Sequence, residues 1–243
     1  MSGHSRTKKT PITKIIASIA AVVIVALGAL FIYNNSFSAS SENKPTETTV
    51  TQEAPKQTYT ASKEEKEYLT NRFNGLKAIN PETVAYVYAP GTELDEPVVQ
   101  TGDNSTYLDK TFEGGNEPYL GTVFMDTENK KDFSDRLTWL FGHARGSQVG
   151  DHRMFNDVNY YDKQEYLDKH KYVVIETPER KLYYQVMGLV IVPEETAFYR
   201  TEFKDDEDFT TQLRNIYEAA RTKDPKIQIK ASDRYLVLST CRE

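Results

Sequence analysis

The chain has 243 residues, a length that suits one domain of ordinary size with appendages. Hydrophobic residues make up 38% of the chain and aromatic residues 12%, which argues against a disordered chain and favours a strand-rich folded body. The formal net charge of -6 comes from interspersed acids and bases without a basic stripe, so we expect no nucleic-acid partner.

An almost uninterrupted apolar run, residues 15–33, follows a short basic segment at the N-terminus. As a helix rising about 1.5 Å per residue, the run nearly crosses a hydrocarbon core of about 30 Å. We therefore predict a single-pass anchor in the cell membrane, with residues 1–14 as a cytoplasmic tail and the rest extracellular. A cleaved signal peptide is the alternative, because Ser38, Ala39 and Ser40 offer small residues for a peptidase.

Residues 34–61 are rich in Ser, Thr, Glu and Pro and contain very few apolar residues, which predicts a flexible extracellular stalk. We expect residues 62–243 to form one folded domain. Ser62 and Glu65 have the spacing of a capping box before an amphipathic helix that ends near Asn80 and Pro81.

Strand patterns dominate the rest of the chain, and we expect a mainly β fold with the sheet closed into a barrel. One amphipathic helix interrupts the pattern, with apolar residues at helical spacing between Phe209 and Ala220. The predicted strands are 84–88, 97–100, 119–125, 137–141, 172–176, 181–192, 226–229 and 235–240.

The only cysteine, Cys241, cannot form an internal disulfide, and it directly follows the predicted strand 235–240. A buried thiol that packs as a small hydrophobe is the alternative to a catalytic one. His143 comes two residues after the strand 137–141, in a position well placed for catalysis. His152, in a polar loop, and His170, at a helix end, are interpreted as structural or solvated. A Cys and a His alone remain a weak signal.

The sequence around these residues resembles the class B sortases from Ser62 to Cys241. The matching segments are VAYVYAPGTELDEPVVQTGDNSTYLDKTF (84–112), GTVFMD (121–126), FGHARG (141–146), MFNDVNYYDKQEYLDKH (154–170) and LSTC (238–241). The resemblance implies an eight-stranded β-barrel with N-terminal helices and a helix before the last strands. It also implies that Cys241 and His143 form the catalytic pair.

The reaction implied by the resemblance is a transpeptidation without metal or cofactor. The thiol attacks the carbonyl of a Thr in the C-terminal sorting signal of a surface or pilin protein, and an amine of a cell-wall precursor or a pilin lysine resolves the thioacyl enzyme. His143 serves as general acid and then as general base. Ser239 and Thr240 are expected to line the substrate groove, although hydroxyl residues also simply suit strands.

The chain departs from the family pattern at its C-terminal end. Class B sortases place an essential arginine on a further strand beyond the cysteine, and this sequence stops at Glu243. Arg242 is adjacent to Cys241 and cannot replace that group, because neighbouring strand residues point to opposite faces. Arg145 is better explained as a solvated loop cation. We therefore expect the final strand to be missing, and the alternative function is a truncated or non-catalytic module that binds sorting signals or pilins.

Overall fold

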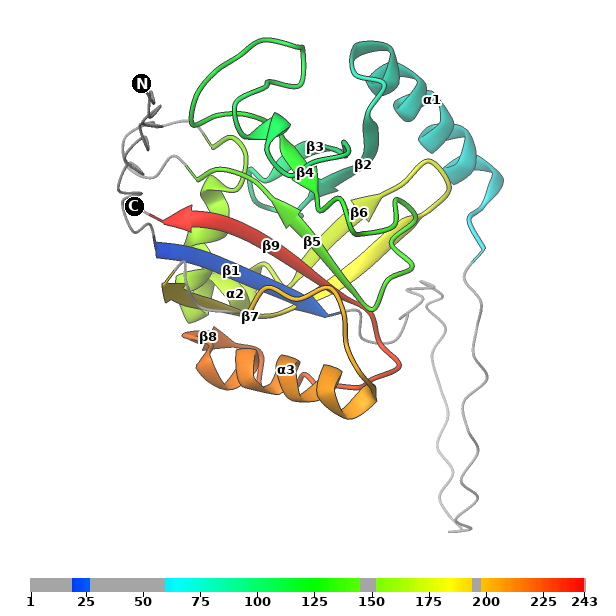
Figure 1. Ribbon diagram of the computed structural model, residues 1–243. Coiled ribbons are helices and arrows are strands. Elements are labelled where there is room, and N and C mark those ends of the chain that lie inside the picture. Colours follow the sequence, from blue (N-terminus) through cyan, green and yellow to red (C-terminus); the bar gives the residue numbers. More distant parts are fainter. Residues whose placement is uncertain (1–18, 27–59, 145–151, 194–197, 243) are drawn as a thin grey trace, which may run out of the picture.

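The computed structural model describes residues 19–26, 60–144, 152–193 and 198–242, with only the backbone given for 19–26, 241 and 242. Its strands form one sheet with the order β1-β9-β5-β4-β3-β2-β6-β7-β8 (Figure 1). The strands are β1 (Ile19–Ala26), β2 (Thr83–Tyr88), β3 (Asp95–Val99), β4 (Val123–Met125), β5 (Leu137–Phe141), β6 (Tyr172–Glu176), β7 (Lys181–Pro193), β8 (Thr222–Lys223) and β9 (Tyr235–Arg242). The helices are α1 (Lys63–Ile79), α2 (Gln164–Lys169) and α3 (Asp206–Ala219), with the 3-10 turns η1 (Thr106–Leu108) and η3 (Asn156–Asp162).

The sheet closes on itself because β1 pairs antiparallel with both β9 and β7. The eight strands from β1 to β7 in the sheet order thus form a ring, and the two-residue β8 extends β7 outside that ring. This confirms the predicted eight-stranded fold. The place beside β9, where a missing final strand was expected to leave a gap, is filled by β1 from the N-terminal part of the chain.

The transmembrane helix predicted over residues 15–33 is wrong where the structure describes this run. Ile19–Ala26 form a strand, and no helix in the described part of the chain is long and apolar enough to cross a membrane. Apolar β-branched residues suit a strand that is paired on both sides, and a continuous apolar run does not by its periodicity distinguish helix from strand. The single-pass membrane location that depended on this helix is corrected by the same finding. Almost all of the predicted stalk lies outside the described residues.

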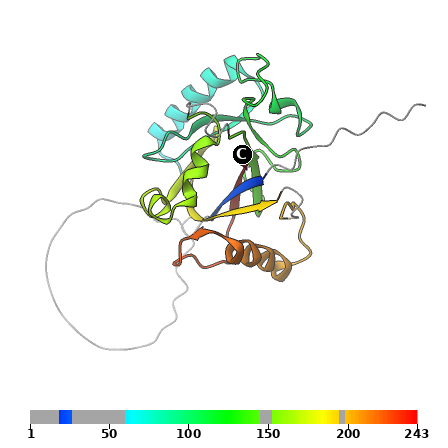
Figure 2. The ribbon, with the colours of Figure 1, turned by 90° about the vertical axis from the view of Figure 1, so that its left-hand side faces the viewer.

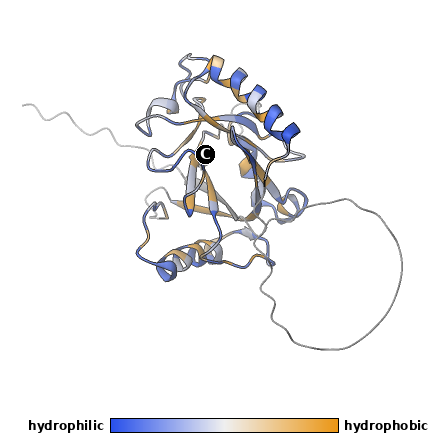
Figure 3. Ribbon diagram, turned by 90° about the vertical axis from the view of Figure 1, so that its right-hand side faces the viewer, coloured by the Kyte–Doolittle hydropathy of each residue, from blue (hydrophilic) through white to orange (hydrophobic). Residues whose placement is uncertain are grey.

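Two apolar clusters lie on the two faces of the ring. Alternate residues of the strands, such as Leu140, Leu236 and Leu238, fill the interior. The intervening residues, including Trp139 and Val237, pack outside the ring against α3. Figures 1 and 2 show α3 and α1 on opposite sides of the sheet, and Figure 3 shows hydrophobic strands between helices with hydrophilic outer faces. The helix α3 therefore covers the apolar part of the outer face of the sheet.

The N-terminal helix α1 begins and ends as predicted. The Ser62 side chain accepts a hydrogen bond from the backbone N–H of Glu65, and Asn80 caps the other end. Glu176 at the end of β6 is only 1% exposed, and it forms ion pairs with Arg72 of α1 at 3.0 Å and with Lys181 of β7 at 2.8 Å. This buried carboxylate is one anchor of α1 on the ring.

Two strand predictions were wrong, one in its existence and one in its extent. Residues 226–229 are not a strand, although Ile227 and Ile229 still pack on the outer cluster, and the short pairing with β7 occurs earlier, at β8. The predicted strand 119–125 is extended only at β4, because Tyr119 and Gly121 have φ angles of 67° and 59°. Such left-handed backbone cannot continue a strand.

Candidate active site

The site is set by the parallel pairing of β5 with β9. Their register runs from Leu137 opposite Tyr235 to Phe141 opposite Ser239. The backbone N–H of Gly142 then donates to the Ser239 carbonyl at 3.1 Å, which carries the contact past the end of β5. His143 and Cys241 each come two residues after the Phe141 and Ser239 pair. The fold thus brings their backbones to the same end of two adjacent strands, which lie about 4.8 Å apart in a sheet.

Gly142, between β5 and His143, lies where there is no room for a side chain. A Cβ atom at this position would lie 2.9 Å from the Phe155 ring and 3.1 Å from a Val123 methyl group. The next carbonyl, that of His143, accepts a hydrogen bond from the Phe155 N–H at 2.9 Å. The backbone of His143 is therefore fixed by the packed segment that carries Phe155.

The imidazole of His143 is partly exposed, and its Nε2 lies 2.8 Å from the carbonyl oxygen of Leu108. A carbonyl oxygen only accepts hydrogen bonds, so Nε2 carries a proton in this arrangement. In the neutral ring, Nδ1 then keeps the lone pair that can take up a proton. The contact therefore distinguishes the two ring nitrogens of His143.

The two hydroxyl residues before Cys241 differ in accessibility. Ser239 is partly exposed, whereas Thr240 is 4% exposed. The difference follows the alternation of β9, in which Leu236 and Leu238 also lie in the interior. Of the two predicted substrate-binding residues, Ser239 is the more accessible to a ligand.

The turn η1, which supplies the Leu108 carbonyl, was not among the predicted site elements. Its start is capped by Asp103, whose carboxylate accepts hydrogen bonds from both the backbone N–H and the hydroxyl of Ser105 and of Thr106, at 2.7–2.8 Å. These bonds hold the pKa of Asp103 well below its ordinary value. The sequence Asp103-Asn104-Ser105-Thr106 carries a recognisable turn signal, because Asp favours capping of the backbone two residues on.

Comparisons with known proteins identify similar chains. The chain is 29% identical over 177 residues to sortase B of Staphylococcus aureus, covering 73% of this chain and 70% of that relative. It is 27% identical over 168 residues to sortase B of Listeria monocytogenes, covering 68% and 65%. No family model matches the sequence.

Solved structures extend the similarity to the fold. A Staphylococcus aureus sortase B–substrate complex superposes with a TM-score of 0.65 at 29% identity, covering 72% of this chain and 78% of that one. A sortase B complexed with Gly3 superposes with a TM-score of 0.65 at 30% identity, covering 72% and 79%. The chain belongs to the class B sortases. This family assignment confirms the resemblance found in the sequence and places the chain among the sortase-type transpeptidases.

An aromatic group lies on the outer face of this sortase beside β5. Tyr199 packs edge-on against Trp139, with ring centroids 5.2 Å apart, and lies 6.2 Å from the Phe141 ring. Its hydroxyl donates at 2.6 Å to Asp126, a fully buried carboxylate. Burial first, and then this hydrogen bond, raise the pKa of Tyr199. No sequence signal connects Tyr199 to Asp126, because 73 residues separate them.

Among the described residues, the two other histidines of this sortase have structural partners. His152 Nδ1 lies 2.9 Å from Oδ1 of the buried Asp157, and His170 caps α2 with its ring 4.4 Å from that of Tyr166. Arg145 lies outside the described residues. These contacts agree with the interpretation of His152 and His170 as structural.

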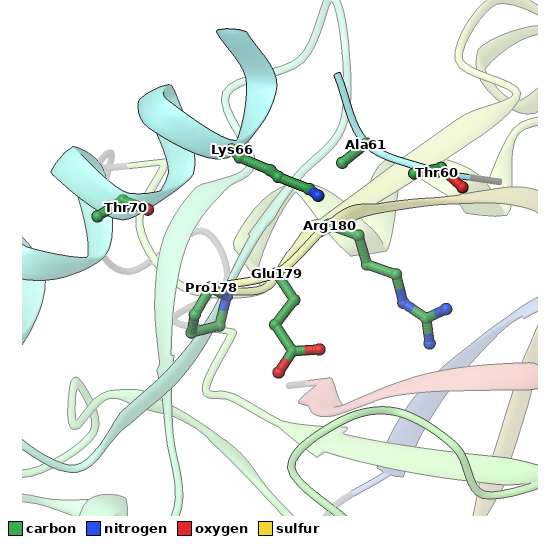
Figure 4. Close-up of a pocket in the computed structure, with 7 residues that line it drawn as sticks. All are labelled: Thr60, Ala61, Lys66, Thr70, Pro178, Glu179 and Arg180. Carbon is green, nitrogen blue, oxygen red and sulfur yellow. The ribbon is translucent and has the colours of Figure 1, made fainter. Parts of the chain in front are cut away.

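A pocket of about 490 Å³ lies between the start of α1 and the turn joining β6 to β7 (Figure 4). It is lined by Thr60, Ala61, Lys66, Thr70, Pro178, Glu179 and Arg180. None of the predicted site residues lines it, so it is separate from the His143 site. Its charged lining side chains, Lys66, Glu179 and Arg180, are exposed or partly exposed, and the lining residues do not form a buried polar site.

Proposed function

We propose that this chain is a cysteine transpeptidase that cleaves a C-terminal sorting signal after Thr and joins the new acyl group to an amine. Cys241 is the nucleophile and His143 the acid and base. The observation that carries this proposal is the common register of His143 and Cys241 at the ends of β5 and β9 in a class B sortase fold. An accessible imidazole with one nitrogen free for proton transfer supports the role of His143.

In the first half of the reaction, the Cys241 thiolate attacks the Thr carbonyl and a carbon–sulfur bond forms. The carbon–nitrogen bond of the scissile peptide then breaks, and the departing amine takes a proton from His143. In the second half, an incoming amine attacks the thioester, gives a proton to His143, and releases the thiolate. The sequence of steps consumes no cofactor and returns both residues to their starting states.

Solved complexes of similar proteins support the proposed substrates. One neighbour is a sortase B–substrate complex and another is a sortase B complexed with Gly3, which supports a sorting-signal peptide as acyl donor and a peptide amine as acceptor. The donor would be a surface or pilin protein, and the acceptor a cell-wall precursor or a pilin lysine. Ser239 is the first candidate to hydrogen-bond the donor, because it is accessible on the strand of Cys241. Thr240, the other predicted substrate contact, is buried and is therefore a weaker candidate for a direct hydrogen bond to the donor.

The test is intact-mass analysis of the chain after incubation with a sorting-signal peptide, with and without triglycine. We expect a thioacyl adduct on Cys241 that disappears when triglycine is added, together with a peptide–triglycine product. Cys241→Ala should form neither. Peptide binding without adduct or product would contradict the enzyme and favour the module that only binds sorting signals.

A further inference from the structure

The position of the Leu108 carbonyl depends on contacts from two directions. At the start of η1, Asp103 caps the turn and the Leu108 N–H donates to the Ser105 carbonyl at 3.1 Å. At its other side, the Thr122 N–H donates to the Tyr107 carbonyl at 3.0 Å. The carbonyl that meets His143 therefore belongs to a turn held against the segment just before β4.

Gly121 lies in that segment, directly against the same two carbonyl groups. A Cβ atom on Gly121 would be 2.3 Å from the Tyr107 oxygen and 2.5 Å from the Leu108 oxygen. Both distances are shorter than any tolerated contact, and the atoms met are backbone, so a side chain here must displace η1. Gly121 also has a φ angle of 59°, which glycine adopts without strain and residues with a side chain rarely adopt.

We propose that Gly121 is a positioning residue for the acid–base histidine. Its missing side chain lets the Leu108 carbonyl reach Nε2 of His143, and this hydrogen bond fixes the proton on Nε2 and leaves Nδ1 as the nitrogen that exchanges protons during turnover. The inference rests on the proposed function insofar as His143 is the acid and base. The hydrogen bond itself can be tested without any turnover.

Gly114 provides a matched control. It also has a positive φ angle, 93°, but no other group lies within 4 Å of where its Cβ would be. Gly114→Ala and Gly121→Ala therefore impose the same kind of backbone strain, and only Gly121→Ala pushes on the Leu108 carbonyl. A difference between the two variants reports the contact, not the loss of a flexible residue.

The experiment records the imidazole ¹⁵N resonances of His143 in the full chain, assigned by their loss in His143→Gln. In the unsubstituted protein above the pKa of the ring, we expect the proton on Nε2. Gly114→Ala should keep this tautomer, and Gly121→Ala should give a mixture of both tautomers. A proton on Nδ1 in the unsubstituted protein would overturn the proposal even if Gly121→Ala fails to fold. Retention of the Nε2 tautomer in a folded Gly121→Ala would also overturn it.

Turnover of a sorting-signal peptide separates this proposal from the proposed function. Displacing an acid–base group by about 1 Å can cost on the order of a hundredfold in rate, so Gly121→Ala should lower kcat by about that factor with little change in KM. If His143→Ala retains activity while the tautomer shift is seen, the proposed role of His143 fails and the positioning contact stands. An unchanged kcat in Gly121→Ala, with His143→Ala inactive, contradicts the positioning role alone.

Discussion

His143 and Cys241 lie at the same level of the sheet, each two residues beyond the cross-strand pair of Phe141 and Ser239. The two strands run parallel, so the register that pairs Phe141 with Ser239 also sets the relative positions of the proposed base and nucleophile. A change in this register by one residue would separate the two groups and reverse the faces of β9. The hydrophobic alternation that buries Leu238 and Val237 on opposite faces therefore also maintains the site.

The first prediction concerns the acid–base group. His143→Ala should lower kcat/KM for peptide transfer by about a hundredfold to ten-thousandfold, the usual cost of losing a general acid or base. His170→Ala is the control, because His170 packs on Tyr166 at the end of α2 and has no place in the proposed reaction. Transfer of a sorting peptide to triglycine measures both. Comparable losses in the two variants would remove the special role of His143.

The second prediction separates the two hydroxyl residues before Cys241. Ser239→Ala should reduce kcat/KM severalfold, as expected for one hydrogen bond to substrate worth about 0.5–1.5 kcal/mol, with no large change in stability. Thr240→Val should act mainly on the free energy of unfolding, since Thr240 is buried. Steady-state kinetics and urea unfolding on both variants give the comparison. A larger kinetic effect from Thr240→Val would reverse the assignment.

Local chemistry made much of this fold predictable. The cap at Ser62, the alternating strands and the helix over Asp206–Ala219 depend on residues near one another in sequence. The short sequence motifs around His143 and Cys241 also identified the catalytic candidates, because they resemble motifs of the class B sortases. The apolar run that contains β1 was misassigned because its local pattern fits helix and strand alike, and only pairing with β7 and β9 distinguishes them.

Long-range contacts account for what the sequence could not provide at the site. The Leu108 carbonyl and His143 are 35 residues apart, and Tyr199 and Asp126 are 73 apart. A carbonyl group has no residue-specific signature, so its role becomes visible only when the fold is known. Gly121 is similar, because a glycine in a predicted strand did not reveal which backbone atoms it would meet.

The third prediction is a pH dependence from Asp103. Hydrogen bonds from Ser105 and Thr106 lower the pKa of the folded carboxyl below its unfolded value, near 3.8. Asp103 therefore contributes stability at pH values above about 4, and the contribution is lost as the pH falls through the lower folded pKa. The Tm of the unsubstituted protein should exceed that of Asp103→Asn at neutral pH, and this gap should narrow in acid. Asp109→Asn, which removes the charge of an exposed neighbour, is the control variant.

The fourth prediction concerns the anchor of α1. Glu176→Gln removes the charge that Arg72 and Lys181 share, and it should destabilise the fold by about 3 kcal/mol, the low end for a broken buried ion pair. The low end is expected because both cations reach water, with 28% and 21% of their side chains exposed. Glu179→Gln, exposed in the adjacent turn, is the matched control for urea unfolding. Equal stability of the two variants would mean that the buried charge contributes nothing net.

The last prediction tests the strand that closes the ring. Val22 is paired with Ser239 of β9 on one side and with Val190 of β7 on the other. Proline has no backbone N–H and is excluded from central strands, so Val22→Pro should remove one ladder hydrogen bond and destabilise the sheet by about 3 kcal/mol or more. Val22→Ala keeps the N–H and serves as the control. Because β1 separates β7 from β9, its displacement would also leave unpaired donors and acceptors on the strand that carries Cys241. Thermal unfolding and amide hydrogen exchange at Ser239 and Val190 should show the difference between the two variants. If Val22→Pro unfolds and exchanges like Val22→Ala, residues 19–26 do not complete the sheet in solution, and β9 is stabilised by β5 alone.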